Sequence, residues 1–237
     1  MTEWLKNLIR PLVFQLRRLR GYPGLDYYRG RIIDIRREYG QVHTFRVTKP
    51  EGLDYQAGQY IHLVAPRGYI NPNDVRHMSF ASAPDESALL FSMNLDSSSR
   101  YKQRFANARV GDAVGLFKVR GQFTLANLGD DDPVLYIAGG IGITPIRSLV
   151  QSQPDRPWQL VYAGNGYCFV ERWQSPEHTR RVNMVTRKGL FGAIDAAQPL
   201  GKTCFVCGSA TFIAAVTAHL QSIGVAEPSI RIENFSE

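Results

Sequence analysis

Cysteine is scarce in this chain of 237 residues. The three cysteines are Cys168, Cys204 and Cys207. Three thiols cannot build a disulfide framework, and an iron–sulfur cluster usually needs four thiolates. The scarcity therefore argues against a disulfide-rich secreted domain and against a fused domain that carries such a cluster, and it favours a reducing, cytoplasmic compartment.

Long apolar runs and several catalytic signatures are also missing. No stretch is long enough to span a bilayer, and charges interrupt the apolar positions near the N-terminus, so no signal peptide is predicted. The five histidines show no metal-ligand spacing, and no Gly-x-Ser-x-Gly nucleophile motif occurs. The net charge of +7 comes without a nucleic-acid-binding signature. We therefore expect no metal and no nucleic acid, and the basic surface favours acidic or phosphorylated partners.

The first segment, residues 1–24, differs from the rest of the chain. Apolar residues recur at helical spacing from Trp4 to Leu19, and most basic residues lie off this stripe. Glycine and proline at 21–24 then end the pattern. We interpret the segment as an amphipathic basic arm. It could pack on the protein's own body, contact a membrane surface peripherally or dock on an acidic partner.

Residues 25–128 predict a small antiparallel β-barrel. Short, partly alternating runs are separated by turn residues such as those at 49–52. Many short strands at this spacing are typical of a closed or nearly closed barrel. One helix is predicted between the strands, from about Ser99 to Ala108, with Ser98 or Ser99 as its N-cap.

Residues 129–237 predict a doubly wound parallel sheet. Val134 to Ala138 is a continuous apolar strand, a glycine-rich turn follows it, and Pro145 opens a helix. Strands and helices then alternate, which implies right-handed crossovers. A glycine turn between a strand and a helix lets backbone N–H groups approach a phosphate, although the same turn can also form without a ligand.

Four short motifs follow one another along these two regions. They are Arg76-His77-Met78-Ser79, the turn GGIGITP from Gly139 to Pro145, Cys207-Gly208-Ser209, and Glu233-Asn234-Phe235. In this order they resemble the ferredoxin–NADP reductase-like superfamily of flavin reductases, whose motifs are Arg-x-Tyr-Ser, Gly-Gly-x-Gly-x-x-Pro, Cys-Gly-Pro and a terminal Glu-x-Phe. The resemblance runs from about Tyr27 to Phe235. Each motif alone would be a weak signal, but four in the family's order and spacing are a strong one.

The resemblance implies an FAD site on the barrel. Arg76 would bind the pyrophosphate, because a guanidinium forks onto phosphate oxygens. Ser79 would hydrogen-bond the flavin near N5, with His77 and Met78 beside the cofactor. Ser98 and Ser99 would meet the pyrophosphate at the start of the barrel helix.

The resemblance also implies a nicotinamide site on the second region. The pyrophosphate of NAD(P)H would lie against Gly139, Gly140, Gly142, Thr144 and Pro145. Cys207 and Gly208 would lie by the nicotinamide ring, and Glu233 would balance protons or place that ring. Ser79, Cys207 and Glu233 are thus the implied catalytic residues. Thr186 and Arg187 would hold the 2′-phosphate of NADPH, although NADH stays open as the coenzyme.

The implied function is that of an FAD-dependent oxidoreductase that takes hydride from NAD(P)H. Electrons would leave to a separate acceptor, such as an acidic ferredoxin- or flavodoxin-type carrier or an oxygenase component. Free flavin, quinone or ferric chelate is an alternative acceptor. A non-catalytic flavin-binding module is a second alternative, because Met78 and Ser209 stand where the family has tyrosine and proline.

Overall fold

The structure is a computed structural model that describes Asp26–Asn234. The predicted arm at residues 1–24, its membrane contact, and Phe235 of the last motif lie outside the described residues. Within the described part of the chain, no helix combines the length and apolar character needed to cross a membrane.

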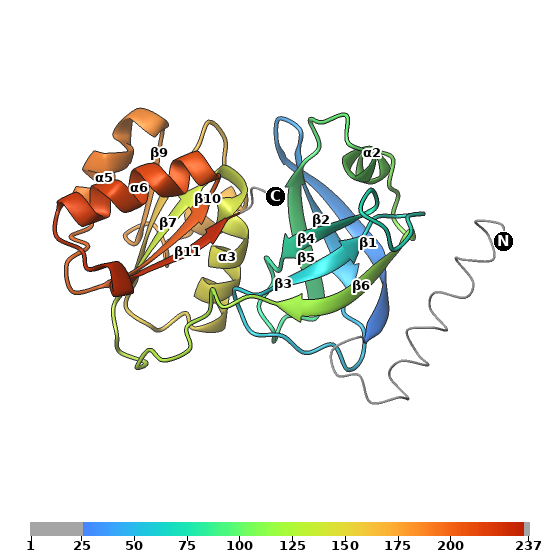
Figure 1. The fold of residues 1–237 in the computed structure, drawn as a ribbon, viewed down its shortest axis with the longest axis horizontal. Coiled ribbons are helices and arrows are strands. Elements are labelled where there is room, and N and C mark those ends of the chain that lie inside the picture. The colour runs from blue at the N-terminus through green and yellow to red at the C-terminus, as the bar shows by residue number, and fades with distance from the viewer. Residues whose placement is uncertain (1–25, 235–237) are drawn as a thin grey trace.

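The first half forms a barrel lobe built on one antiparallel sheet (Figure 1). Its strands are β1 (Tyr27–Tyr39), β2 (Val42–Thr48), β3 (Tyr60–Val64), β4 (Val75–Ser79), β5 (Ala88–Asn94) and β6 (Ala113–Arg120). The order is β4-β3-β6-β1-β2-β5, so β4 and β5 are the edges of a curved sheet. The predicted antiparallel barrel is confirmed as a barrel-like sheet, and the hydrogen bonding does not close it.

Apolar side chains that alternate along these strands fill the inside of the barrel lobe. Phe45 of β2 meets Phe105 edge-on at 4.8 Å between ring centroids, and Tyr55 stacks on Phe80 at 3.8 Å. Phe105 belongs to α2 (Arg100–Ala106), the helix predicted from the sequence. The Ser99 side chain caps this helix by accepting a hydrogen bond from the backbone N–H of Lys102 at 3.4 Å.

The second half forms an α/β lobe around a parallel sheet. Its strands are β7 (Val134–Gly139), β8 (Trp158–Ala163), β9 (Val182–Val185), β10 (Thr203–Gly208) and β11 (Ile230–Asn234), in the order β11-β10-β7-β8-β9. The helices are α3 (Ile143–Ser152), α4 (Val170–Trp173), α5 (Leu190–Ala196) and α6 (Ala210–Ser222). Three short 3₁₀ turns complete it, η1 (Gly140–Gly142), η2 (Arg187–Gly189) and η3 (Glu227–Ser229).

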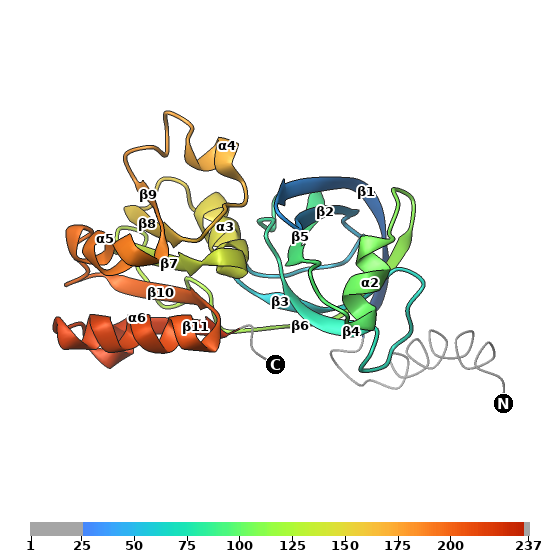
Figure 2. The same cartoon turned by 90° about the horizontal axis from the view of Figure 1, so that it is seen from above.

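Helices cover both faces of this parallel sheet (Figure 2). Along β7, Tyr136 and Ala138 pack in a cluster with α3, whereas Leu135 and Ile137 pack in a cluster with α5 and α6. The sequence of a strand that is buried on both faces is a continuous apolar run, and β7 has such a sequence. The predicted doubly wound sheet is therefore confirmed.

The strand order reverses between β7 and β10. From β7 the chain proceeds to β8 on one side and later returns to β10 on the other. In open α/β sheets a ligand crevice forms outside the carboxyl ends of the strands at this point. The two lobes lie side by side with α3 facing the barrel (Figures 1 and 2), so this crevice opens toward the barrel lobe.

Candidate functional site

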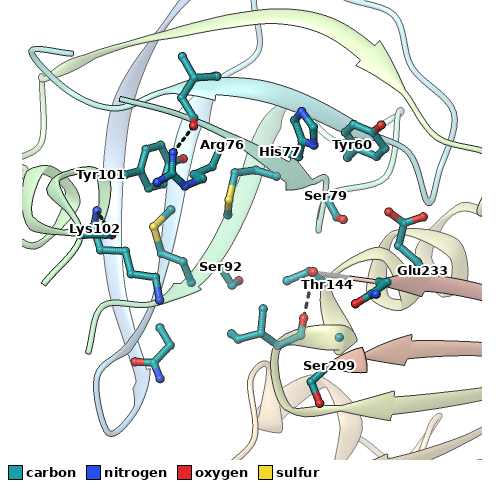
Figure 3. A pocket seen from close by; sticks show the side chains of 18 of the residues that line it. Tyr60, Arg76, His77, Ser79, Ser92, Tyr101, Lys102, Thr144, Ser209 and Glu233 are labelled. Carbon is teal, nitrogen blue, oxygen red and sulfur yellow. Dashed lines mark hydrogen bonds between the residues drawn. The ribbon is translucent and has the colours of Figure 1, made fainter. Parts of the chain in front are cut away.

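A cavity of about 1140 Å³ lies between the two lobes. Its walls come from β4 and the start of α2 on the barrel side, and from the ends of β7, β10 and β11 on the α/β side. Ten residues predicted for the site line it: Arg76, His77, Met78, Ser79, Ser99, Gly139, Gly142, Thr144, Gly208 and Glu233. The chain thus brings five segments, separate in sequence, to one place (Figure 3).

Arg76 stands on the barrel wall of the cavity. Its Nη1 donates hydrogen bonds to the backbone carbonyls of Pro72 and, at 2.7 Å, Val75. Its guanidinium lies 5.5 Å from the centroid of the Tyr101 ring. No carboxylate among the described residues forms an ion pair with it, so this oriented cation is suited to an anionic ligand.

The start of α2 is fixed beside Arg76 by a buried carboxylate. Asp74 accepts from Arg104 Nε at 2.8 Å and pairs with Arg100 at 3.1 Å. Burial raises the pKa of Asp74, but hydrogen bonds from Asn71 and the Tyr69 N–H, together with Arg104, outweigh burial and lower it. The carboxylate therefore stays ionised and holds the loop before β4 against the helix whose Ser99 and Lys102 line the cavity.

The glycine turn after β7 forms the opposite wall. A Cβ on Gly142 would lie 2.1 Å from the carbonyl oxygen of Cys207, so only glycine lets the turn touch the end of β10. Helix α3 begins directly after this turn, and no side chain caps its first turn. Because the Ile143 N–H already donates to the Gly140 and Ile141 carbonyls and Pro145 has no N–H, a phosphate here would meet the backbone of the glycine turn rather than the first residues of α3.

Cys207 lies behind this wall. Its side chain is fully buried in the core cluster shared with α3, and it does not line the cavity. Burial raises the pKa of the thiol well above its ordinary value, with the nearby Glu233 adding to the shift. At this position the cavity is lined by the next residues, Gly208 and Ser209.

Glu233 reaches the cavity from the edge strand β11, beside Cys207 in the parallel register. Its carboxyl group and the Ser79 hydroxyl point into the space from opposite lobes (Figure 3). Burial raises the pKa of Glu233 from 4.5 to about 7. A carboxyl group with this pKa can hold or release a proton near neutral pH.

Some residues predicted for the site lie elsewhere. The residues that do not line the cavity are Ser98, Gly140, Pro145, Thr186, Arg187 and Cys207. Pro145 is buried in α3, and Thr186 and Arg187 are exposed after β9, two strands from β7. Their roles stay predictions.

Several lining residues were not predicted. They include Tyr60 on β3, Ser92, Met93 and Asn94 on β5, and Tyr101 and Lys102 on α2. Strand pairing brings Tyr60 opposite Ser79, and no local motif marks it. Lys102 carried a weak signal, since it lies one turn after the predicted cap Ser99.

Several known proteins are similar to this chain in sequence or in fold. No family model matches the chain. Flavohemoprotein A of Dictyostelium discoideum is 25% identical over 209 residues, covering 76% of this chain and 52% of that protein. This chain thus spans about half the length of that relative.

Solved structures share the arrangement of both lobes. Phthalate dioxygenase reductase superposes with a TM-score of 0.73 at 21% identity, covering 89% of this chain and 68% of that one. The ferredoxin NADP⁺ reductase from Neisseria gonorrhoeae, with bound FAD and NADP, gives 0.68 at 16% identity and covers 89% and 99%. This chain has the ferredoxin reductase-like fold. The resemblance predicted from the four motifs is thus confirmed for the fold.

Proposed function

We propose that this chain is an FAD-dependent NAD(P)H oxidoreductase. The observation that supports this most strongly is one cavity shared by both lobes, with cationic and hydroxyl groups on the barrel side and a glycine turn on the other. At about 1140 Å³ it exceeds the ~300–1000 Å³ of ordinary small-molecule pockets. That size suits two extended cofactors whose reactive rings meet.

The barrel side fits FAD. Arg76 and Lys102 would supply positive charge to the pyrophosphate, and Ser99 would add a hydroxyl. Tyr60, Met78 and Met93 would offer aromatic and thioether surface to the ring system. Met78 stands where the family has tyrosine, so we expect a less rigid stack than an aromatic ring provides.

The α/β side fits a nicotinamide dinucleotide. The pyrophosphate would lie over Gly139 and Gly142, against the backbone of the turn that leads into α3. The hydroxyls of Thr144 and Ser209 also line this side. Thr144 donates its hydroxyl hydrogen to the Ile141 carbonyl at 3.1 Å, so its oxygen keeps lone pairs for an incoming donor.

When bound, the flavin supplies the chemistry that accepts hydride and then gives up electrons. The protein aligns the two cofactors and excludes water between them. Ser79 would donate its hydroxyl hydrogen bond on the flavin side. Glu233, with its pKa raised to about 7, would hold or release a proton opposite Ser79.

The coenzyme we propose is NADPH. Thr186, Arg187 and Lys188 follow β9 and are exposed, and a hydroxyl with two cations suits a dianionic phosphate. Arg187→Ala should lower kcat/KM for NADPH about tenfold or more and leave NADH unaffected, whereas Arg180→Ala should change neither. Equal losses for both coenzymes, or a preference for NADH in the natural chain, would contradict NADPH and favour NADH.

The acceptor we propose is a separate, acidic electron-carrier protein or an oxygenase component. Phthalate dioxygenase reductase is described as passing electrons from pyridine nucleotides to a [2Fe-2S] group, and the net charge of +7 favours an acidic partner. Reduction of an acidic ferredoxin should slow as ionic strength rises, because salt screens this attraction. Faster turnover with free flavin, quinone or ferric chelate would favour those acceptors instead.

Reconstitution tests the proposed enzyme. The chain should retain one FAD after gel filtration and should then reduce an artificial one-electron acceptor with NADPH or NADH. Stoichiometric FAD without turnover would favour a flavin-binding module. Failure to take up FAD would contradict the proposal.

A further inference from the structure

Two histidines form a pair on the outer face of the barrel sheet. His62 on β3 and His77 on β4 are direct cross-strand partners. Their Nε2 atoms lie 2.9 Å apart. His77 is exposed at the rim of the cavity and His62 is half-buried, so the pair can be reached from solvent.

The orientation of His62 is set by its other nitrogen. Nδ1 lies 3.3 Å from the backbone carbonyl of Lys118, which can only accept a hydrogen bond. The proton therefore sits on Nδ1, and the lone pair of Nε2 faces His77. Histidines that bind metals characteristically donate their second ring N–H to a carbonyl or carboxylate in this way.

Neighbouring rings hold both imidazoles in place. His77 stacks on Tyr60 with 5.1 Å between centroids and 29° between planes, and the two rings lie side by side in Figure 3. His62 meets His77 edge-on at 4.2 Å and contacts the Phe117 ring at 5.1 Å. A pair whose side-chain orientations are already fixed loses little freedom when it binds an ion.

We propose that His62 and His77 together bind one divalent transition-metal ion through their Nε2 atoms, with the His77 ring proton carried on Nδ1 when the metal is bound. With metal–nitrogen distances of ~2.0–2.1 Å, a separation of 2.9 Å gives a nitrogen–metal–nitrogen angle of roughly 90°. That is the angle between neighbouring ligands in tetragonal or octahedral sites, which favours Cu²⁺ and Ni²⁺ over tetrahedral Zn²⁺. The inference does not depend on the proposed reductase function.

The site is a two-nitrogen chelate. Within Asp26–Asn234 no group of three or more potential metal-ligating side chains occurs, so water would complete the coordination. Lys118 and Arg120 place positive charge near His62 and oppose a bound cation. We therefore infer an exchangeable site that responds to metal concentration.

Calorimetric titration of the full chain with NiCl₂ tests the proposal. The natural chain should bind one Ni²⁺, and His62→Gln and His77→Gln should each weaken binding at least about tenfold. The control His43→Gln changes a histidine opposite Met93, where no second imidazole is available, and should leave binding unchanged. Thermal unfolding checks that each variant folds. Absence of binding in the natural chain, or undiminished binding in His77→Gln, would overturn the site.

Charge and spectroscopy provide a second test. Lys118→Met should tighten Ni²⁺ binding, because it removes a nearby cation and keeps the backbone carbonyl that orients His62, whereas the remote Lys188→Met should not.

With Cu²⁺, electron paramagnetic resonance should show coupling to two imidazole nitrogens in the natural chain and to fewer in His77→Gln. The same copper spectrum in both proteins would contradict the assignment.

Discussion

Arg76 carries the most specific expectation for a single residue. It is a cation on the cavity wall, oriented by two backbone carbonyls and the Tyr101 ring. Arg76→Ala should weaken FAD binding at least tenfold, because charge-assisted hydrogen bonds contribute ~1.5–3 kcal/mol each and ~1.4 kcal/mol is a factor of ten. Flavin fluorescence titration measures the loss.

The control for Arg76 is Arg46→Ala, which removes an exposed arginine from β2 and should retain FAD. If Arg76→Ala kept stoichiometric FAD through gel filtration, another group would have to hold the pyrophosphate.

Met78→Tyr adds a ring at the same wall of the cavity and should tighten FAD binding, since an aromatic face stacks on the flavin better than a thioether.

Glu233 makes the stability of the protein depend on pH. Burial raises its pKa from 4.5 to about 7, so folding favours the protonated form. The stability associated with that form is fully present below pH 4.5 and is lost as the pH rises through about 7. Glu233→Gln should therefore raise the unfolding temperature at pH 8 more than at pH 5.

Thermal unfolding of Glu233→Gln at both pH values measures this difference. The control Glu227→Gln changes an exposed carboxylate on η3 and should shift the unfolding temperature equally at the two pH values. An equal effect of Glu233→Gln at pH 5 and pH 8 would show that its carboxyl group is not perturbed by folding.

The sequence motifs predicted which segments of the chain form the site, but not which atoms of those segments face the cavity. The motif at Cys207 correctly predicted a turn at the end of a strand, but side-chain alternation buries its sulfur and leaves Gly208 at the cavity. His62 and His77 are 15 residues apart and meet only through antiparallel register. No spacing rule within one segment could have paired them.

At the scale of elements, α3 is tied to the barrel segment that follows β4. Arg147 of α3 makes two hydrogen bonds to the Glu86 carboxylate, at 2.8 and 3.0 Å, and a third to the Ala81 carbonyl at 2.7 Å. Ser148 donates to the Ser82 carbonyl at 2.6 Å. Since α3 follows the glycine turn and this segment follows Ser79, the contact sets the distance between the two halves of the cavity.

Breaking the Arg147–Glu86 pair should therefore slow hydride transfer while leaving FAD affinity nearly unchanged. Glu86→Gln should also cost about 1–3 kcal/mol of unfolding free energy, because it leaves a buried guanidinium without its charged partner. Burial raises the pKa of Glu86, but Arg147, the Ala83 N–H and the charge of Arg172 together outweigh burial and lower the pKa, so this stability is lost in acid.

Stopped-flow flavin reduction and urea unfolding measure the two effects. Glu171→Gln breaks the exposed Arg36–Glu171 pair, whose side chains are 47% and 80% exposed, and should have little effect. Normal flavin reduction in Glu86→Gln and Arg147→Met would show that the pair does not position the cofactors.

Elements marked by a cap or by a continuous apolar run were predictable, and short helices without a cap were not. The helix expected from about Ser99 to Ala108 is α2, and the apolar strand at Val134 is β7. The end of β4 leaves no local signal, because the strand ends at Ser79 and the residues that follow, Phe80 to Ala83, are as fully buried as strand residues. Helices α4 and α5 were not predicted, because no side chain caps either of them, whereas Ser99 marks the start of α2, which is no longer than α5.

At the scale of the whole molecule, the order of the two lobes was predictable, because the hydrophobic pattern of the sequence changes from short alternating runs to continuous apolar strands. The packing of the two lobes against each other was not predictable. One core cluster joins Val42, Ala81 and Phe123 of the first half to α3 and β7 of the second. Such contacts are non-local and leave no periodic signal in the sequence.

The central claim is that this shared cavity brings a nicotinamide and a flavin together. Anaerobic mixing of the FAD-loaded chain with NADPH or NADH tests it most directly, followed by flavin absorbance in a single turnover. We predict rapid bleaching, slowed when the coenzyme carries deuterium at the transferred position. FAD that stays oxidised with both coenzymes would contradict the account.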